Sequence, residues 1–121
     1  MMSEQSYEDE NLAHIDNFQV ELQMRLIRIF PESIAQYLPI NELTIREFFN
    51  KSISAWQIEQ DKKLSDLLVL PFEDQFSILK SIIKSTKSKL SKILIKSEQV
   101  AKLEFAINEY LYFYKRNLCL N

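Results

Sequence analysis

The chain of 121 residues contains no glycine. Glycine adopts positive φ angles without steric cost, and average usage would place about eight of them in a chain of this length. Phosphate-binding loops, dinucleotide-binding loops and nucleophile elbows all need that backbone freedom or a close backbone approach. Tight two-residue hairpins also lose their best turn residues. The missing glycine therefore predicts helices joined by short connections of asparagine, serine or proline.

Length and composition predict one globular domain over residues 1–121, with residues 1–8 disordered. Domains commonly span about 100–150 residues, and 46% hydrophobic with 26% charged residues is a globular composition. The longest apolar run, at residues 67–72, is far shorter than the roughly 20 residues that a bilayer span needs. The N-terminus is acidic and polar, unlike a secretory signal. We therefore expect a cytoplasmic protein with no membrane contact.

Apolar residues spaced three and four apart predict a first helix over residues 12–30. Pro31 either ends this helix or opens a short segment at residues 32–38, because proline has no amide hydrogen to donate and clashes with the preceding turn. Both alternatives place a change of direction near residue 31.

A second long helix is predicted after Pro39. Thr44 and Glu47 match the spacing of a capping box, in which each side chain bonds the backbone amide of the other residue. The apolar series that starts at Ile45 then continues to residue 56. Residues 61–70 are predicted to form another helix or a bent continuation, which Pro71 closes.

The segment from residue 72 to residue 121 contains neither proline nor glycine and keeps one heptad-like apolar seam. One helix of more than forty residues would satisfy this pattern, and so would a pair of helices broken near Lys96 and Ser97. We favour the break, because Ser97 with Glu98 resembles a cap followed by an acid in a first turn. The seam consists of Phe76, Leu79, Ile83, Thr86, Leu90, Ile93, Ser97, Val100, Leu103, Ile107, Tyr110 and Tyr114.

Together these patterns predict an all-α fold, a compact bundle of four to five helices in which the last ~45 residues form a long helix or a helical pair. The predicted core consists of Leu22, Leu26, Phe48, Phe49, Trp56, Ile83, Ile93, Leu103 and Ile107.

Candidate catalytic and metal-binding residues are scarce. His14 is the only histidine and Cys119 the only cysteine, so a zinc site would lack most of its usual nitrogen and sulfur ligands. A lone cysteine cannot form an internal disulfide, which fits a reducing compartment. We expect no catalytic residues, no metal and no cofactor.

Charge is segregated along the chain although the net charge is only −2. Residues 1–24 carry six acids and no lysine or arginine, whereas residues 75–97 carry six lysines and no acid. The lysine face is interpreted in three ways: a solvated face opposite the acidic first helix, a docking surface for an acidic protein, or a contact for nucleic-acid phosphates. The six lysines are Lys80, Lys84, Lys87, Lys89, Lys92 and Lys96.

Four aromatic residues occur within residues 110–114. Tyr110, Phe113 and Tyr114 can share a buried stripe, but Tyr112 points away from it. One helix face cannot hide all four rings, so some aromatic surface is expected to be exposed. Tyrosine and arginine are enriched at binding hot spots.

The sequence therefore predicts a small non-enzymatic protein–protein interaction module of adaptor, chaperone, immunity or inhibitor type. Its partner is expected to be a protein of unknown identity, and a homodimer stays open. The alternative is a nucleic-acid-associated regulator that uses the lysines of residues 80–96, which is less favoured because arginine forks are missing there. Lysine in excess of arginine, with abundant isoleucine and asparagine, is typical of AT-rich bacterial or phage genomes. The candidate partner-binding residues are Lys80, Lys84, Lys87, Tyr112, Phe113 and Arg116.

Overall fold

The computed structural model describes residues 20–119, with the side chain of Cys119 excepted. Every regular element in this range is a helix. A helical segment at residues 20–28 precedes α2 (Phe30–Ala35), α3 (Glu42–Gln60), α4 (Leu64–Leu67), α5 (Phe72–Ile93) and α6 (Ser97–Cys119). The predicted all-α bundle is confirmed. Residues 1–8 and the predicted start of the first helix lie outside the described range.

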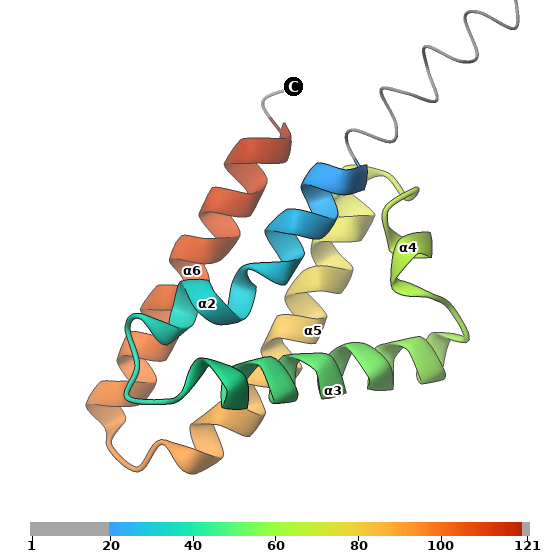
Figure 1. Ribbon diagram of the computed structural model, residues 1–121. Coiled ribbons are helices and arrows are strands. Elements are labelled where there is room, and N and C mark those ends of the chain that lie inside the picture. The colour runs from blue at the N-terminus through green and yellow to red at the C-terminus, as the bar shows by residue number, and fades with distance from the viewer. Residues whose placement is uncertain (1–19, 120–121) are drawn as a thin grey trace, which may run out of the picture.

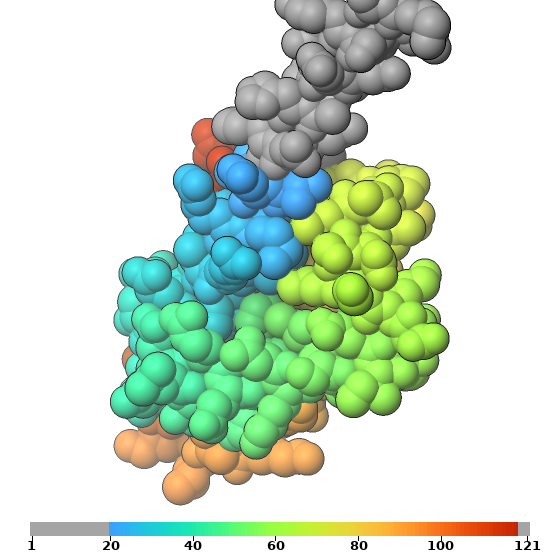
Figure 2. Space-filling view, turned by 45° about the vertical axis from the view of Figure 1, so that its right-hand side comes forward, coloured from blue at the N-terminus to red at the C-terminus, as the bar shows by residue number. Residues whose placement is uncertain are grey.

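The two longest helices, α5 and α6, run antiparallel and are joined at one end of the molecule (Figure 1). Helix α2 contacts both α3 and α6, and α3 contacts α5 as it crosses it. In the space-filling view the blue surface of residues 20–28 meets the green surface of α3 directly (Figure 2). The core therefore lies between the α5–α6 pair on one side and α3 with residues 20–35 on the other.

The chain changes direction at Ile29, between the helical segment 20–28 and α2. Pro31 lies in the first turn of α2 and has no amide hydrogen for the carbonyl of Ile27. A first turn tolerates proline because its amides have no partner inside the helix. Of the two predicted roles of Pro31, the structure supports the opening of a short helical segment. This segment, α2, ends at Ala35 and so is shorter than the predicted segment 32–38.

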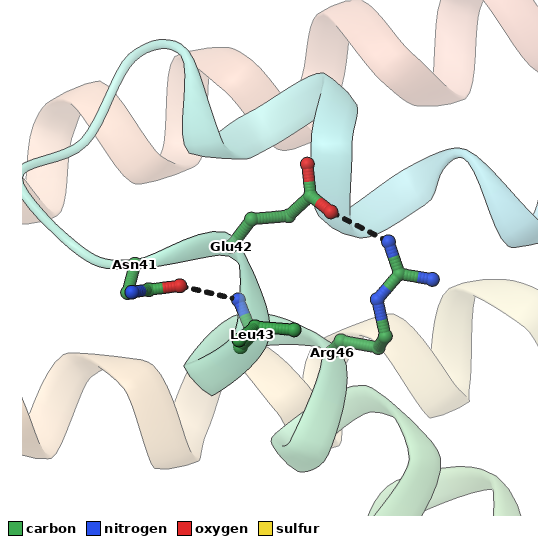
Figure 3. Close-up of polar contacts among 4 residues, drawn as sticks. All are labelled: Asn41, Glu42, Leu43 and Arg46. Carbon is green, nitrogen blue, oxygen red and sulfur yellow. Dashed lines mark hydrogen bonds and ion pairs between the residues drawn. The ribbon is translucent and has the colours of Figure 1, made fainter.

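Helix α3 begins earlier than the sequence predicts. The Asn41 side chain accepts a 2.8 Å hydrogen bond from the amide of Leu43, and Arg46 donates to Glu42 over 2.6 Å one turn later (Figure 3). The predicted capping box at Thr44 and Glu47 is therefore wrong, since both residues lie inside the helix. Asparagine is a stronger N-cap than threonine, and its extended backbone (φ −62°, ψ 136°) fits that position.

The predicted helix at residues 61–70 is reduced to the single turn of α4. Helix α3 ends at Gln60, and its C-cap residue Asp61 adopts the left-handed conformation with φ 52° and ψ 47°. The amide of Lys63 donates to the Asp66 side chain over 2.9 Å and so stabilises the short turn. Pro71 then occupies the N-cap of α5.

The favoured break in the C-terminal half is confirmed, because α5 ends at Ile93 and α6 begins at Ser97. Leu94 leaves the helix with an extended backbone (φ −91°, ψ 111°). The Lys96 carbonyl accepts hydrogen bonds from the amides of Gln99 and Val100, so Lys96 and not Ser97 is the cap. The prediction of the cap residue was wrong by one position.

Most of the predicted core is buried, but one member is not. Leu26, Phe49, Ile83, Leu103 and Ile107 are buried, and Leu22, Phe48 and Trp56 pack at the edge of the core. Ile93 is 47% exposed, so its assignment to the core was wrong. Because α5 ends at Ile93, the next residue turns inward instead, and Leu94 is buried.

Candidate functional site

Helix α6 presents aromatic rings to solvent because its apolar residues exceed what one face can bury. Leu103, Ile107 and Tyr110 lie in the core. Since a helix turns about 100° per residue, Phe105 and Tyr112 point away from these residues. Phe105 is 55% exposed and Tyr112 is 66% exposed. The prediction that Tyr112 faces outward is confirmed.

Two further rings extend this surface. Tyr37, just after α2, and Phe113 on α6 are each nearly half exposed. The Tyr37 and Phe105 rings lie 6.1 Å apart with an edge-to-face angle of 76°, so the turn after α2 and helix α6 meet on one surface. We call the four residues Tyr37, Phe105, Tyr112 and Phe113 the aromatic face. Phe113 therefore departs from the buried stripe that its spacing allowed.

A shallow pocket of about 260 Å³ lies beside the aromatic face, between α2 and α6. This volume is below that of most small-molecule sites, which measure roughly 300–1,000 Å³. The pocket could accept a single side chain of a partner. It is lined by Ile29, Ser33, Gln36, Tyr37, Ala106, Glu109, Tyr110 and Phe113.

Two buried tyrosines hold α6 in place behind the aromatic face. The Tyr110 hydroxyl donates a 2.6 Å hydrogen bond to the Leu26 carbonyl. Tyr114 stacks on Phe72 and Phe76, with ring centres 6.4 and 6.3 Å away. Burial raises the pKa of Tyr114 to about 12. Burial also raises the pKa of Tyr110, with a smaller contribution from Tyr114. Both hydroxyls stay protonated near neutral pH and serve packing.

The six predicted lysines do not form one free surface. The Lys87 ammonium pairs with Glu104 of α6 at 3.0 Å, and Lys89 donates to the Ser52 hydroxyl of α3 at 3.3 Å. Lys80 lies 5.5 Å from the centre of the Phe76 ring. Lys80 is nevertheless exposed, as are Lys84, Lys92 and Lys96. The lysine face is therefore partly used to join α5 to its neighbours.

A second groove, of about 430 Å³, lies between α5 and α6. It brings the predicted residues Lys80, Lys84 and Lys87 to one rim, above an apolar floor of Ile83, Ile107 and Leu111. Tyr112, Phe113 and the exposed Arg116 do not line this groove. The predicted site residues thus fall into two groups, on different sides of α6.

Sequence reasoning missed Tyr37 and Phe105. Phe105 lies two residues after Leu103 of the heptad seam, and that offset is the signal that places it outside. Tyr37 lies in the turn after α2, where helical spacing gives no guide to exposure.

Among the described residues, no group of three or more His, Cys, Asp or Glu side chains could hold a metal ion. His14 lies outside the described range, and the Cys119 side chain is not described. None of the helices within residues 20–119 has the length and apolar character to cross a membrane.

Comparisons with known proteins gave no significant match to a family model, to a curated protein or to a solved structure.

Proposed function

We propose that the chain is a small non-enzymatic protein-interaction module that binds its partner through the aromatic face. The observation that carries this proposal is the set of four exposed rings, three on α6 and Tyr37 in the turn after α2, in which Tyr37 and Phe105 are in edge-to-face contact. Aromatic residues and arginine are enriched at interfaces. Aromatic side chains bury a large area and lose little conformational freedom. The adjoining pocket of about 260 Å³ would receive an anchoring side chain.

The charged residues beside the rings also suit a protein partner. Glu109 and Arg116 are exposed on α6 next to Tyr112 and Phe113. An apolar patch rimmed by charged side chains is typical of interaction sites. Adaptor, chaperone, immunity and inhibitor proteins all act through such helical surfaces, and a reducing cytoplasm is the expected setting.

Affinity capture with the full-length tagged chain, from a lysate of the native host, tests this function. Phe105→Ala combined with Tyr112→Ala is expected to abolish capture of the specific partner. Ile58→Ala is the matched control, because Ile58 is 82% exposed on α3 and does not belong to the aromatic face. Either a different protein or a second copy of the chain counts as a partner. Identical captured sets for wild type and the double variant would overturn the proposal.

A nucleic-acid-associated regulator is the second candidate, supported by Lys80 and Lys84 on the rim of the α5–α6 groove. Such a regulator would bind a short duplex at low salt, lose affinity as salt rises, and lose it with Lys80→Glu and Lys84→Glu. The pairing of Lys87 with Glu104 weakens this candidate by neutralising one of the cations. Undetectable duplex binding at low salt would exclude a nucleic-acid-associated regulator.

A further inference from the structure

Helix α6 carries two seams with the same spacing. The buried seam consists of Leu103, Ile107, Tyr110 and Tyr114, with intervals of four, three and four residues. The exposed seam repeats these intervals two positions later. It consists of Phe105, Glu109, Tyr112 and Arg116, all of them exposed.

Alternation of four and three residues is the spacing by which two helices pack along a coiled-coil contact. At about 100° and 1.5 Å per residue, the exposed seam occupies an arc of ~60° and a length of ~16 Å on α6. One seam of α6 thus packs inside the bundle, and the other has the spacing for a helix outside it.

The charges of the exposed seam are unpaired within the described part of the chain. Glu109 and Arg116 form no ion pair with any side chain of residues 20–118. By contrast, Glu104 pairs with Lys87 and Glu98 lies 3.8 Å from Lys102 on the same helix. The exposed seam therefore holds one acid and one base that lack an intramolecular partner in this range.

The exposed seam is also symmetric about its midpoint between Glu109 and Tyr112. A two-fold axis at that point places Phe105 opposite Arg116 of a second copy, and Glu109 opposite Tyr112 of the second copy. A guanidinium over a ring and a phenol that donates to a carboxylate are both favourable contacts. Glu109 and Arg116 of the second copy would then lie in neighbouring layers, with opposite charges.

A parallel arrangement of the two α6 helices is unfavourable. Two parallel copies of α6 would bring Glu109 against Glu109 and Arg116 against Arg116, and like charges in contact at an interface are destabilising. The sequence of the seam therefore selects an antiparallel arrangement. Tyr37 and Phe113 would widen the same contact on the α2 side, so that both copies contribute one identical patch, as two-fold interfaces require.

We propose that the aromatic face binds a second copy of this chain, with the two α6 helices antiparallel along the exposed seam. This inference rests on the proposed function and names the partner of that surface.

Sedimentation equilibrium of the full-length chain, over a range of concentrations in reductant, provides the first test. Wild type is expected to reach twice the chain mass of 14.4 kDa. Tyr112→Asp is expected to weaken self-association at least ~10-fold, because it buries a charge at the contact. Ile58→Asp introduces the same charge at an exposed residue on α3 and is expected to leave the mass unchanged. Circular dichroism verifies that each variant stays helical.

A charge exchange tests the orientation. Glu109→Arg alone and Arg116→Glu alone each create like charges across an antiparallel contact, so each is expected to give a monomer. The double variant restores opposite charges and is expected to restore the dimer. In a parallel pair the double variant would keep like charges opposed, so failure of rescue would overturn the proposal.

The remaining outcomes separate this inference from the proposed function. A wild-type monomer at all concentrations would overturn the second copy as partner. If such a monomer still captures another protein in a Tyr112-dependent manner, the proposed function stands without the inference. A dimer that is insensitive to Tyr112→Asp would overturn the proposal about this surface.

Discussion

The Tyr110 hydroxyl donates a hydrogen bond of 2.6 Å to the backbone carbonyl of Leu26, 84 positions earlier in the chain. Leu26 lies in the helical segment that precedes the change of direction at Ile29. Phe30 follows, fully buried, with its ring centre 4.9 Å from that of Tyr110 and 4.6 Å from that of Phe49. The bond thus joins the middle of α6 to the bend where three segments meet.

Tyr110 and Tyr114 provide a matched pair of deletions. Tyr110→Phe removes the bond to Leu26 and is expected to lower the free energy of unfolding by about 0.5–1.5 kcal/mol. The Tyr114 hydroxyl is buried and has no hydrogen-bond partner among the described residues, so Tyr114→Phe is expected to be neutral or stabilising. Urea unfolding measures both, and a larger loss for Tyr114→Phe would contradict this account.

The same two phenols predict a loss of stability at high pH. Burial raises the pKa of Tyr114 to about 12 and also raises the pKa of Tyr110, whereas both lie near 10 in the unfolded chain. Above pH 10 the unfolded chain releases protons that the folded chain retains, so unfolding becomes more favourable as pH rises. The stabilisation is complete below pH 10.

Urea midpoints measured from pH 8 to about 12 test this dependence. Replacing both Tyr110 and Tyr114 by phenylalanine is expected to make the decline above pH 10 less steep, because two linked groups are removed. Lysines titrate in the same range and provide the background in both proteins. An unchanged slope in the double variant would show that these phenols are not the linked groups.

Gln75 is a buried polar side chain that joins three segments. Its amide donates to the carbonyls of Leu70 and Leu68 at 2.7 and 3.1 Å, and its oxygen accepts from Gln23 at 3.0 Å. Gln75→Leu leaves these groups without partners, and each unsatisfied buried group costs about 1–3 kcal/mol. We expect a loss of at least ~2 kcal/mol in urea unfolding.

Gln36→Leu is the control for that experiment. Gln36 is exposed and donates to the Ser33 carbonyl over 2.9 Å, so water can replace the bond and a change within about 0.5 kcal/mol is expected. Equal effects of the two substitutions would show that the buried hydrogen bonds of Gln75 contribute nothing specific.

Asp61 marks the one non-glycine residue with positive φ in the described range. Asp61→Gly is expected to raise the free energy of unfolding by about 0.5 kcal/mol, because glycine adopts the left-handed conformation without the clash of a Cβ atom. Asp61→Ala keeps that clash and removes the short polar side chain that makes the left-handed conformation tolerable for aspartate, so it is expected to lower the free energy of unfolding by about 1 kcal/mol. Thermal unfolding measures the stability of both variants. Stabilisation by Asp61→Ala would contradict the expected cost of the left-handed conformation.

Apolar periodicity, together with proline positions and first-turn acids, was sufficient to predict the main helices. The seam from Leu79 to Tyr114 and the interruption before Ser97 were both predicted, since long repeats and first-turn acids are local signals. The N-cap of α3 was not predicted correctly, because Asn41 and Thr44, three residues apart, are both favourable N-cap residues. The assignment of Ile93 to the core failed because α5 ends at that residue, before the predicted break near Lys96, and Leu94 turns inward in its place.

The candidate site was only partly predictable. The exposure of Tyr112 followed from its offset to the seam, and the same rule applied to Phe105 would have found it. The engagement of Lys87 and Lys89 could not be predicted, because their partners Glu104 and Ser52 lie 17 and 37 positions away in the chain. Such contacts depend on how helices cross, which spacing within one helix does not encode.

The short connection at residues 94–96 also affects the order in which the helices fold. Contacts across the α5–α6 turn join residues near in sequence, so they close small loops and lose little chain entropy. The bond between Tyr110 and Leu26 closes a much larger loop. Because low contact order favours early formation, the α5–α6 hairpin is expected to nucleate folding, with the 20–28 segment docking last as a cover over a preformed hairpin.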